Sequence, residues 1–145
     1  MTPFPHTYRV EAVSTRDGAV TLSSVGLPAL VTQPPAEFGG PGDAWSPETL
    51  LTGAIADCYV LSFRAVARAS GLSWSSIRCD IDATLDRVDG ITRFTRYALN
   101  VQLQAAAGTD PDAAEKALHK AKKVCLISNS LSAEGALATT ISIDG

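Results

Sequence analysis

One nearly continuous apolar stretch, Ser46–Val66, constrains the fold of this chain more than any other part of its sequence. It begins with the signals of a helix start. Ser46 is a good N-cap, because its hydroxyl can accept a hydrogen bond from a free backbone N–H of the first turn. Pro47 suits the first helical position, and Glu48 suits the positive end of the helix dipole. Ser70–Gly71 predicts the C-terminal end of the helix. Apolar residues then cover nearly every face across Leu50–Phe63, which predicts a long, buried helix.

The composition fits a soluble protein with a substantial core. With 145 residues, 46% of them hydrophobic and 19% charged, we expect a single domain over residues 1–145. The net charge of −3 disfavours nucleic acid and anionic membranes as partners. No signal peptide is visible, and Asp57 and Arg64 interrupt the apolar stretch before the roughly 20 residues needed to cross a bilayer. Three cysteines, an odd number, do not suggest a secreted disulfide framework, so we expect a cytoplasmic protein.

The residues before the central helix predict a small sheet. Thr7–Val13, Ala19–Ser24 and Leu27–Thr32 read as three short strands, the first two joined by a turn at Ser14–Gly18 that contains the Asp-Gly hairpin signal. The following segment, Gln33–Pro47, is rich in proline and glycine and is expected to be a loop.

The residues after the central helix predict a hairpin. Ile77–Asp86 alternates strictly between apolar and polar residues, which is typical of a half-buried strand. Asp89–Gly90 is a second hairpin signal, and Tyr97–Leu103 continues the alternation as the partner strand. Phe94 is out of step with that strand, which predicts a bulge near Thr95–Arg96.

A second helix and a last strand complete the expected order. Asp110 and Pro111 suit the N-cap and first position of a helix that runs to about Val124. Ala136–Ile143 alternates again and is expected to form the last strand. The resulting order, βββ-α-ββ-α-β, indicates an α+β fold rather than a doubly wound sheet.

The three cysteines are the candidates for chemistry. Cys79 is in phase with Ile77 and Ile81 on the apolar side of its strand, so we expect it to serve as core packing. Cys58 and Cys125 have no second cysteine two to four residues away, which argues against a structural zinc site. They could be two buried thiols, or they could meet as a pair suited to peroxide chemistry, in which a sulfenic acid condenses to a disulfide. Their spacing leaves both readings open. No cofactor motif or phosphate-binding loop is present.

A reactive thiolate in an apolar helix needs a nearby cation. Arg16, in the first predicted turn, is one candidate, and an exposed turn arginine is the alternative reading. Glu48 could hold an arginine in place, or it could simply contact the helix dipole. Glu48 precedes Cys58 by ten residues, about 15 Å along a helix axis, which an arginine can hardly bridge within one chain. Either Glu48 lies outside the helix, or the site draws on two subunits.

Four segments together resemble the OsmC/Ohr family, the osmotically inducible and organic hydroperoxide resistance proteins. The resemblance extends from about Arg16 to the C-terminus. The segments that carry it are Glu37–Gly40, Ser46–Leu51, Ala56–Cys58 and Cys125–Leu131. The combination of a Ser-Pro-Glu helix start, a cysteine ten residues later and a second cysteine before Ser-Asn is fairly specific.

The resemblance implies an intertwined homodimer of α+β subunits with sites at the dimer interface. It implies a thiol-dependent peroxidase that reduces organic hydroperoxides and is recycled by a dithiol reductant, with no metal or other cofactor. Carried over residue by residue, Cys58 would be the peroxidatic thiolate and Cys125 the resolving one. Arg16 would activate Cys58 and orient the peroxide, and Glu48 would anchor Arg16.

Two departures from the family pattern are relevant. Leu126 stands where many members have proline after the second cysteine, and Phe63–Leu72 looks more like a generic branch of the family than the organic-hydroperoxide branch. A dimer of the same fold that senses redox state or binds a small apolar ligand, without efficient turnover, is the alternative to the peroxidase.

Overall fold

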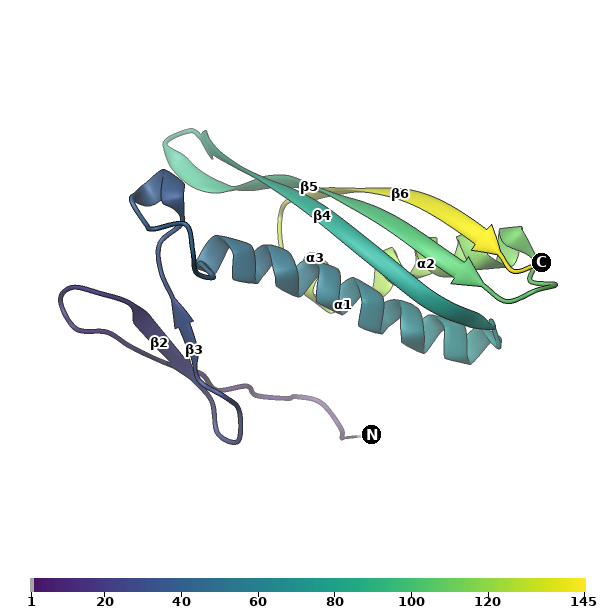
Figure 1. Cartoon of the computed structure of the whole chain (residues 1–145), viewed down its shortest axis with the longest axis horizontal. Coiled ribbons are helices and arrows are strands. Elements are labelled where there is room, and N and C mark those ends of the chain that lie inside the picture. The colour runs from purple at the N-terminus through teal and green to yellow at the C-terminus, as the bar shows by residue number, and fades with distance from the viewer. Residues whose placement is uncertain (1) are drawn as a thin grey trace. The chain divides into compact units, whose positions relative to one another are not determined.

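The computed structural model describes residues 2–145 and separates into two compact units (Figure 1). One unit is Met1–Leu51 and the other is Thr52–Gly145. The single domain over residues 1–145 stays a prediction.

The first unit contains a three-stranded antiparallel sheet of β1 (Glu11–Val13), β2 (Val20–Ser23) and β3 (Leu30–Thr32), in that order. All three strands lie where the sequence predicted them and are shorter. The β1–β2 connection covers residues 14–19, so it is longer than the two-residue turn that an Asp-Gly pair favours. The predicted loop after β3 contains a short 3₁₀ helix, η1 (Ala36–Phe38), which the sequence analysis missed.

Helix α1 (Pro47–Ser70) has the start and end that its sequence predicts. The backbone N–H of Thr49 donates to Ser46 Oγ at 3.1 Å, and the N–H of Ser46 donates to Thr49 Oγ1 at 2.9 Å. This reciprocal capping satisfies donors that the first helical turn leaves without partners. Gly71 ends the helix with φ 69°, a left-handed conformation that glycine adopts without steric cost.

The buried surface of α1 is narrower than predicted. Only four residues, spaced one helical turn apart, are fully buried: Ile55, Tyr59, Phe63 and Ala67. The side of α1 that includes Leu61, which is 51% exposed, is not covered. Within the second unit the prediction of a helix buried on nearly every face is therefore wrong, because the core fully buries only one stripe of α1 and leaves the adjacent Val60 and Val66 half-buried.

Length and composition alone would allow α1 to cross a bilayer, since the helix continues through Asp57 and Arg64 for 24 residues. Asp57 and Arg64 therefore do not make the helix too short to cross a bilayer, and that prediction is wrong. The same test is passed by core helices of soluble proteins, and the buried stripe of α1 packs in the hydrophobic core of the second unit.

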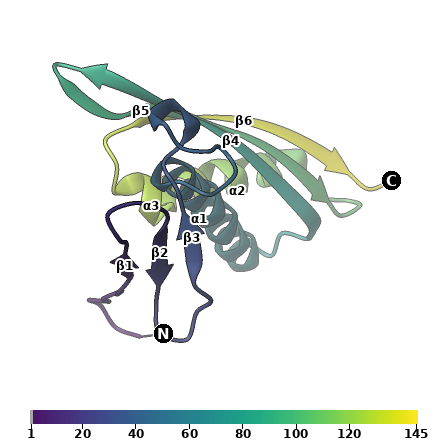
Figure 2. The ribbon, with the colours of Figure 1, turned by 60° about the vertical axis from the view of Figure 1, so that its left-hand side comes forward.

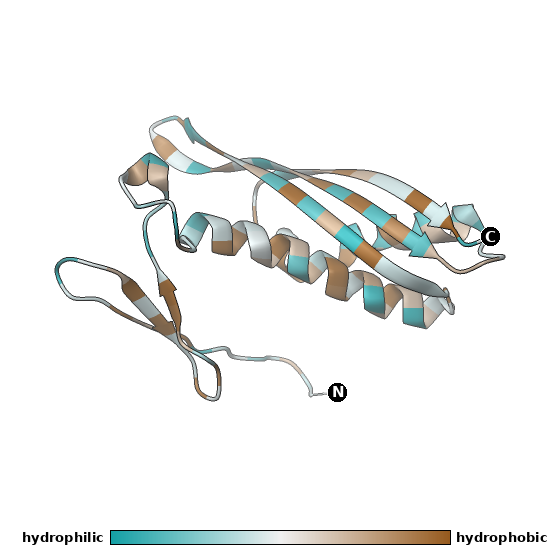
Figure 3. Cartoon of the chain, in the orientation of Figure 1, coloured by the Kyte–Doolittle hydropathy of each residue, from teal (hydrophilic) through white to brown (hydrophobic). Residues whose placement is uncertain are grey.

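The second unit contains a long three-stranded sheet of β4 (Trp74–Val88), β5 (Ile91–Ala105) and β6 (Glu134–Ile143). Figure 3 shows apolar and polar residues alternating along β4 and β5, as the sequence predicts for strands with one buried face. The two-residue connection Asp89–Gly90 joins them, with positive φ at both residues. Thr84 pairs with Arg96 and Leu85 with Phe94, so Thr95 is the extra residue of a bulge, which confirms the prediction.

β6 pairs parallel to β5, so this sheet is mixed. The expectation of antiparallel strands holds for the β4–β5 pair and fails for β6, because the segment between β5 and β6 returns the chain to the same end of the sheet. That segment forms α2 (Pro111–Val124) and the one-turn helix α3 (Leu126–Asn129). α2 has its predicted bounds and its predicted cap, with Asp110 Oδ1 accepting from the N–H of Asp112 at 3.1 Å. α3 was not predicted.

The core of the second unit lies between the sheet and the helices, which cover one face of the sheet (Figures 1 and 2). Inward-facing residues of β5 and the inner face of α2 meet the buried stripe of α1 there. The fully or nearly fully buried members from β5 and α2 are Tyr97, Leu99, Val101, Leu103, Ala114, Ala117, Leu118 and Ala121.

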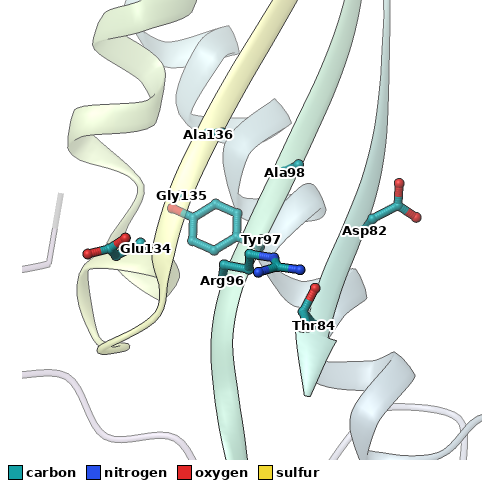
Figure 4. Close-up of a pocket in the computed structure, with 8 residues that line it drawn as sticks. All are labelled: Asp82, Thr84, Arg96, Tyr97, Ala98, Glu134, Gly135 and Ala136. Atoms are coloured by element: carbon teal, nitrogen blue, oxygen red, sulfur yellow. The ribbon is translucent and has the colours of Figure 1, made fainter. Parts of the chain in front are cut away.

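The Tyr97 ring packs against the backbone of Gly135 on the neighbouring strand (Figure 4). A Cβ at position 135 would collide with the end of the ring, and Tyr97 is only 6% exposed. Glycine is therefore required at this position by the close approach of an aromatic side chain, since no φ constraint applies there.

We expect Gly135→Ala to destabilise the protein by about 1–3 kcal/mol, because the buried ring has little room to move. Urea unfolding measures the change. Ala138→Ser, at an exposed position of the same strand, is the control and should stay within about 0.5 kcal/mol of the parent. Equal stability of Gly135→Ala and the parent would show that Tyr97 does not pack in this way.

Candidate functional site

Cys58 lies on α1, beside the buried stripe rather than within it. It directly precedes the fully buried Tyr59, and its own side chain is half-buried. The sulfur lies 3.9 Å from the hydroxyl oxygen of Ser62, one turn further along α1. Cys58 is therefore held by the helix at the border between core and surface.

Cys125 occupies the single residue between α2 and α3 and is only 1% exposed. Its Sγ lies 3.9 Å from the backbone oxygen of Ile55, one turn before Cys58 on α1, to which it donates a weak hydrogen bond. The neighbouring Cys58 thiol also acts on the pKa of Cys125, so the two side chains lie close together. The second unit thus brings together the two cysteines that the sequence left 67 positions apart.

A shallow depression of about 480 Å³ opens on the Cys58 side of this pair. Its lining is mostly apolar, with the carboxylate of Asp57 and the hydroxyl of Ser62 as the polar side chains besides the thiol. The lining residues come from α1 and α3 and are Ala54, Asp57, Cys58, Leu61, Ser62, Ala65, Leu126 and Ile127. Cys58 is thus reachable from the depression, whereas Cys125 lies beneath the surface.

The surroundings of Cys125 keep its thiol protonated. Burial raises the pKa of Cys125, hydrogen bonding by Ser128 opposes that rise, and the neighbouring Cys58 adds to it. The net direction is upward, so Cys125 is a poor candidate for the first nucleophile. It is better suited to react second, with an already oxidised sulfur of a neighbouring residue.

Cys79 faces the core as the alternation of β4 predicts, and it packs against the hydrophobic cluster. Burial raises its pKa to about 11, with smaller contributions from Asp80 and Cys125. The thiol therefore has little thiolate character near neutral pH, which agrees with core packing.

Arg16 and Glu48 belong to the first unit. Arg16 lies in the β1–β2 connection and is exposed, and Glu48 lies in the first turn of α1. Since α1 is one helix from Pro47 to Ser70, Glu48 is not outside it, and about 15 Å of helix axis separates Glu48 from Cys58. The functional assignments of Arg16 and Glu48 stay predictions.

Sequence reasoning missed Ser62, Ser128 and the contribution of α3. Ser62 is one helical turn from Cys58, so a search for polar residues at i+4 from a candidate thiol would have found it. Ser128 needed knowledge that residues after Cys125 form a helical turn, in which Ser128 Oγ donates to the backbone oxygen of Cys125 at 3.2 Å. Within residues 2–145, no group of three His, Cys, Asp or Glu side chains is placed to hold a metal ion.

Comparison with known proteins gives a consistent result. The family model "OsmC-like protein" matches residues 40–140. The chain is 29% identical over 100 residues to the uncharacterized protein YmaD of Bacillus subtilis (strain 168), covering 67% of each protein. It is 32% identical over 89 residues to the peroxiredoxin OsmC of Escherichia coli (strain K12), covering 61% of this chain and 62% of that protein.

Solved structures share the fold over nearly the whole chain. An OsmC-like protein of unknown function from Vibrio cholerae O1 biovar eltor superposes with a TM-score of 0.86 at 18% identity, covering 94% of this chain and all of the other. An organic hydroperoxide resistance protein OsmC from Legionella pneumophila superposes with a TM-score of 0.69 at 27% identity, covering 97% and 99%. The α+β fold with a long helix is therefore that of OsmC-like proteins.

The raised pKa of Cys79 predicts a loss of stability at alkaline pH. The unfolded thiol ionises near its ordinary pKa of 9.0 and the folded one near 11, so between these values the unfolded state binds fewer protons than the folded state. One proton corresponds to an upper limit of about 1.4 kcal/mol per pH unit for the fall in the free energy of unfolding. The actual fall should be smaller, because solvent reaches the half-buried thiol.

Urea titrations between pH 8 and 11, roughly the window set by these pKa values, measure that slope. Cys79→Ser removes this titration, so its free energy of unfolding should depend less on pH in this window than that of the parent. Below pH 8 the two proteins should show the same slope. An identical slope in both proteins would mean that Cys79 is not buried as a neutral thiol.

Proposed function

Because the chain belongs to the OsmC-like protein family, we propose that it is a thiol-dependent peroxidase that reduces organic hydroperoxides to alcohols. The observation that carries the proposal is the pairing of Cys58 with Cys125 below a mostly apolar depression. Two thiols within reach of each other supply the two electrons that reduction of an O–O bond requires. An apolar depression suits a substrate with a hydrocarbon tail.

The reaction proceeds in two steps. The Cys58 thiolate attacks the terminal oxygen of the hydroperoxide, the O–O bond breaks, and the alcohol leaves after taking a proton, so Cys58 becomes a sulfenic acid. The Cys125 sulfur then attacks Cys58 Sγ, and the sulfenic oxygen leaves as water with the Cys125 proton. The products are an alcohol, water and a Cys58–Cys125 disulfide, which an external dithiol reduces.

The different depths of the two sulfurs support this assignment of roles. Cys58 borders the depression, so a peroxide can reach it. Cys125 is buried with a raised pKa, so it is kept from reacting with peroxide and held for the second step. If Cys125 reacted first and Cys58 second, the peroxide would have to enter the core.

In this proposal the chain acts as an intertwined cytoplasmic homodimer, with Arg16 activating Cys58 and Glu48 anchoring Arg16. Two observations support a site made from two chains. Glu48 and Cys58 lie in the same helix about 15 Å apart, so one arginine can hardly contact both within a chain. The second unit also leaves an apolar side of its part of α1 uncovered, including Leu61.

We expect Cys58→Ser to abolish consumption of cumene hydroperoxide, because no other thiol borders the depression. Without added thiol, Cys125→Ser should consume about one equivalent and stop at a sulfenic acid, whereas the parent should stop at the Cys58–Cys125 disulfide. Cys79→Ser is the matched control and should form the same disulfide and keep turnover with dithiothreitol. Peroxide consumption, measured first without thiol and then with dithiothreitol, and mass spectrometry of the protein oxidised without thiol distinguish these outcomes.

Peroxide reduction by Cys58→Ser at the parental rate would contradict the proposal, and a disulfide to Cys79 would contradict the pairing. Oxidation of Cys58 that dithiothreitol cannot reverse would instead assign the chain to the redox-sensing alternative.

We expect Arg16→Ala to lower the rate of Cys58 oxidation about 100-fold, the scale seen when one charge-stabilising donor is removed from an active site. Arg9→Ala, at another exposed arginine of the same unit, should leave the rate unchanged. Stopped-flow measurement of the first oxidation step separates this effect from recycling.

Mixing the weakly active Arg16→Ala protein with the inactive Cys58→Ser protein tests the two-chain site. If each Cys58 uses the arginine of its partner, subunit exchange should restore about a quarter of parental activity, from one complete site in half of the dimers. No recovery after verified subunit exchange would place both groups in one chain.

A further inference from the structure

The lysines of this acidic chain are confined to one helix. The chain has a net charge of −3, and all four of its lysines, Lys116, Lys120, Lys122 and Lys123, lie in α2. At 100° per residue, Lys116, Lys120 and Lys123 fall within about 60° of one another, opposite the buried face of the helix. These three exposed residues are called the lysine stripe below.

The stripe is not neutralised by the protein itself. Within residues 2–145 none of the lysines makes an ion pair, and Glu115, the acidic residue in the middle of α2, is bound by Thr139 and His119. Stabilisation of the helix dipole explains basic residues in the last turn only. Lys116 lies in the middle of α2, so that effect does not account for the whole stripe.

The stripe leads directly to the cysteine pair. Lys123 is followed by Val124, which is 48% exposed, by Cys125, and by Leu126, which is 66% exposed and lines the depression beside Cys58. A basic strip thus continues into exposed apolar side chains at the rim of the site. Charged or polar residues around exposed apolar ones are the usual composition of a transient protein interface.

We propose that the lysine stripe, with Val124 and Leu126, is the docking surface for a protein dithiol donor that carries carboxylates around its own thiols. This inference rests on the proposed function, because it concerns the step that reduces the Cys58–Cys125 disulfide. One donor thiolate attacks Cys58 Sγ and releases Cys125, which takes a proton. The second donor thiol then attacks the mixed disulfide, which frees Cys58 and leaves the donor oxidised.

The accessibility of the two sulfurs favours a donor at this place. Cys125 is 1% exposed, so the donor must attack Cys58 from the depression. With a second subunit along the Leu61 side of α1, the donor would approach over the α3 side of the depression, which Leu126 lines. The adjacent lysines would attract carboxylates of the donor and orient its approach. At the lysine stripe itself a second copy of this chain is a poorer fit, since two stripes facing each other across a twofold axis would repel.

The experiment compares two synthetic peptides that share a Cys-Gly-Pro-Cys dithiol and differ only in flanking residues, four Glu in one and four Gln in the other. The protein is first oxidised with cumene hydroperoxide, and the Cys58–Cys125 disulfide is verified by mass spectrometry. At low salt we expect the Glu peptide to reduce it about tenfold faster than the Gln peptide. Roughly 0.5 M NaCl should abolish the difference.

The variant Lys116→Gln, Lys120→Gln, Lys123→Gln should lose about tenfold with the Glu peptide and keep its rate with the Gln peptide and with dithiothreitol. The matched control, Arg87→Gln, Arg93→Gln, Arg96→Gln, removes the same charge from exposed positions on the β4–β5 hairpin and should keep the preference for the Glu peptide. Equal rates for the two peptides, or equal losses in both triple variants, would overturn the docking surface.

A binding measurement keeps this result separate from the proposed function. A fluorescent Glu peptide with both cysteines replaced by serine should bind Cys58→Ser protein in a lysine-dependent, salt-sensitive manner, even if peroxide forms no disulfide. Failure of the disulfide to form rejects the peroxidase alone. Lysine-dependent binding of a short DNA duplex, with no preference for the Glu peptide, would reject the docking surface in favour of nucleic acid.

Discussion

The rotation of α1 about its axis is the constraint on which the candidate site depends. Tyr59 is fully buried, and its hydroxyl donates to the backbone oxygen of Leu118 in α2 at 2.9 Å. Cys58 is one residue and therefore 100° away from Tyr59 around the helix, which places it at the edge of the core. A helix rotated by one residue would bury the thiol and expose the phenol, at the cost of a buried hydrogen bond.

The same packing positions the second cysteine. The Tyr59–Leu118 hydrogen bond joins α1 to α2, and the last turn of α2 leads into Cys125, whose sulfur lies against the backbone of Ile55. Ile55 and Tyr59 are both in the buried stripe of α1. One set of hydrophobic contacts therefore determines the accessibility of Cys58 and the position of Cys125 beneath it, so the chemistry of the pair depends on core packing as much as on the thiols.

Features set by neighbouring residues could be predicted from the sequence, and features set by distant contacts could not. The cap at Ser46, the end of α1 at Gly71 and the bulge at Thr95 depend on local geometry, and all three were predicted. The parallel direction of β6, the narrow buried stripe of α1 and the contact between Cys58 and Cys125 depend on how the elements pack. Spacing along the chain carries no information on such contacts. It left the cysteine pair open as one of two readings, and the family resemblance favoured it.

The uncovered side of α1 and the distance between Glu48 and Cys58 are independent arguments for a second subunit. The first concerns hydrophobic area, because a soluble chain rarely leaves a large apolar surface in contact with water. The second concerns reach, because no side chain spans about 15 Å of helix axis. A second subunit lying along α1 would cover the apolar side. It could also bring its own arginine to Cys58 or to Glu48. A packing requirement and a catalytic requirement would then be satisfied by the same interface.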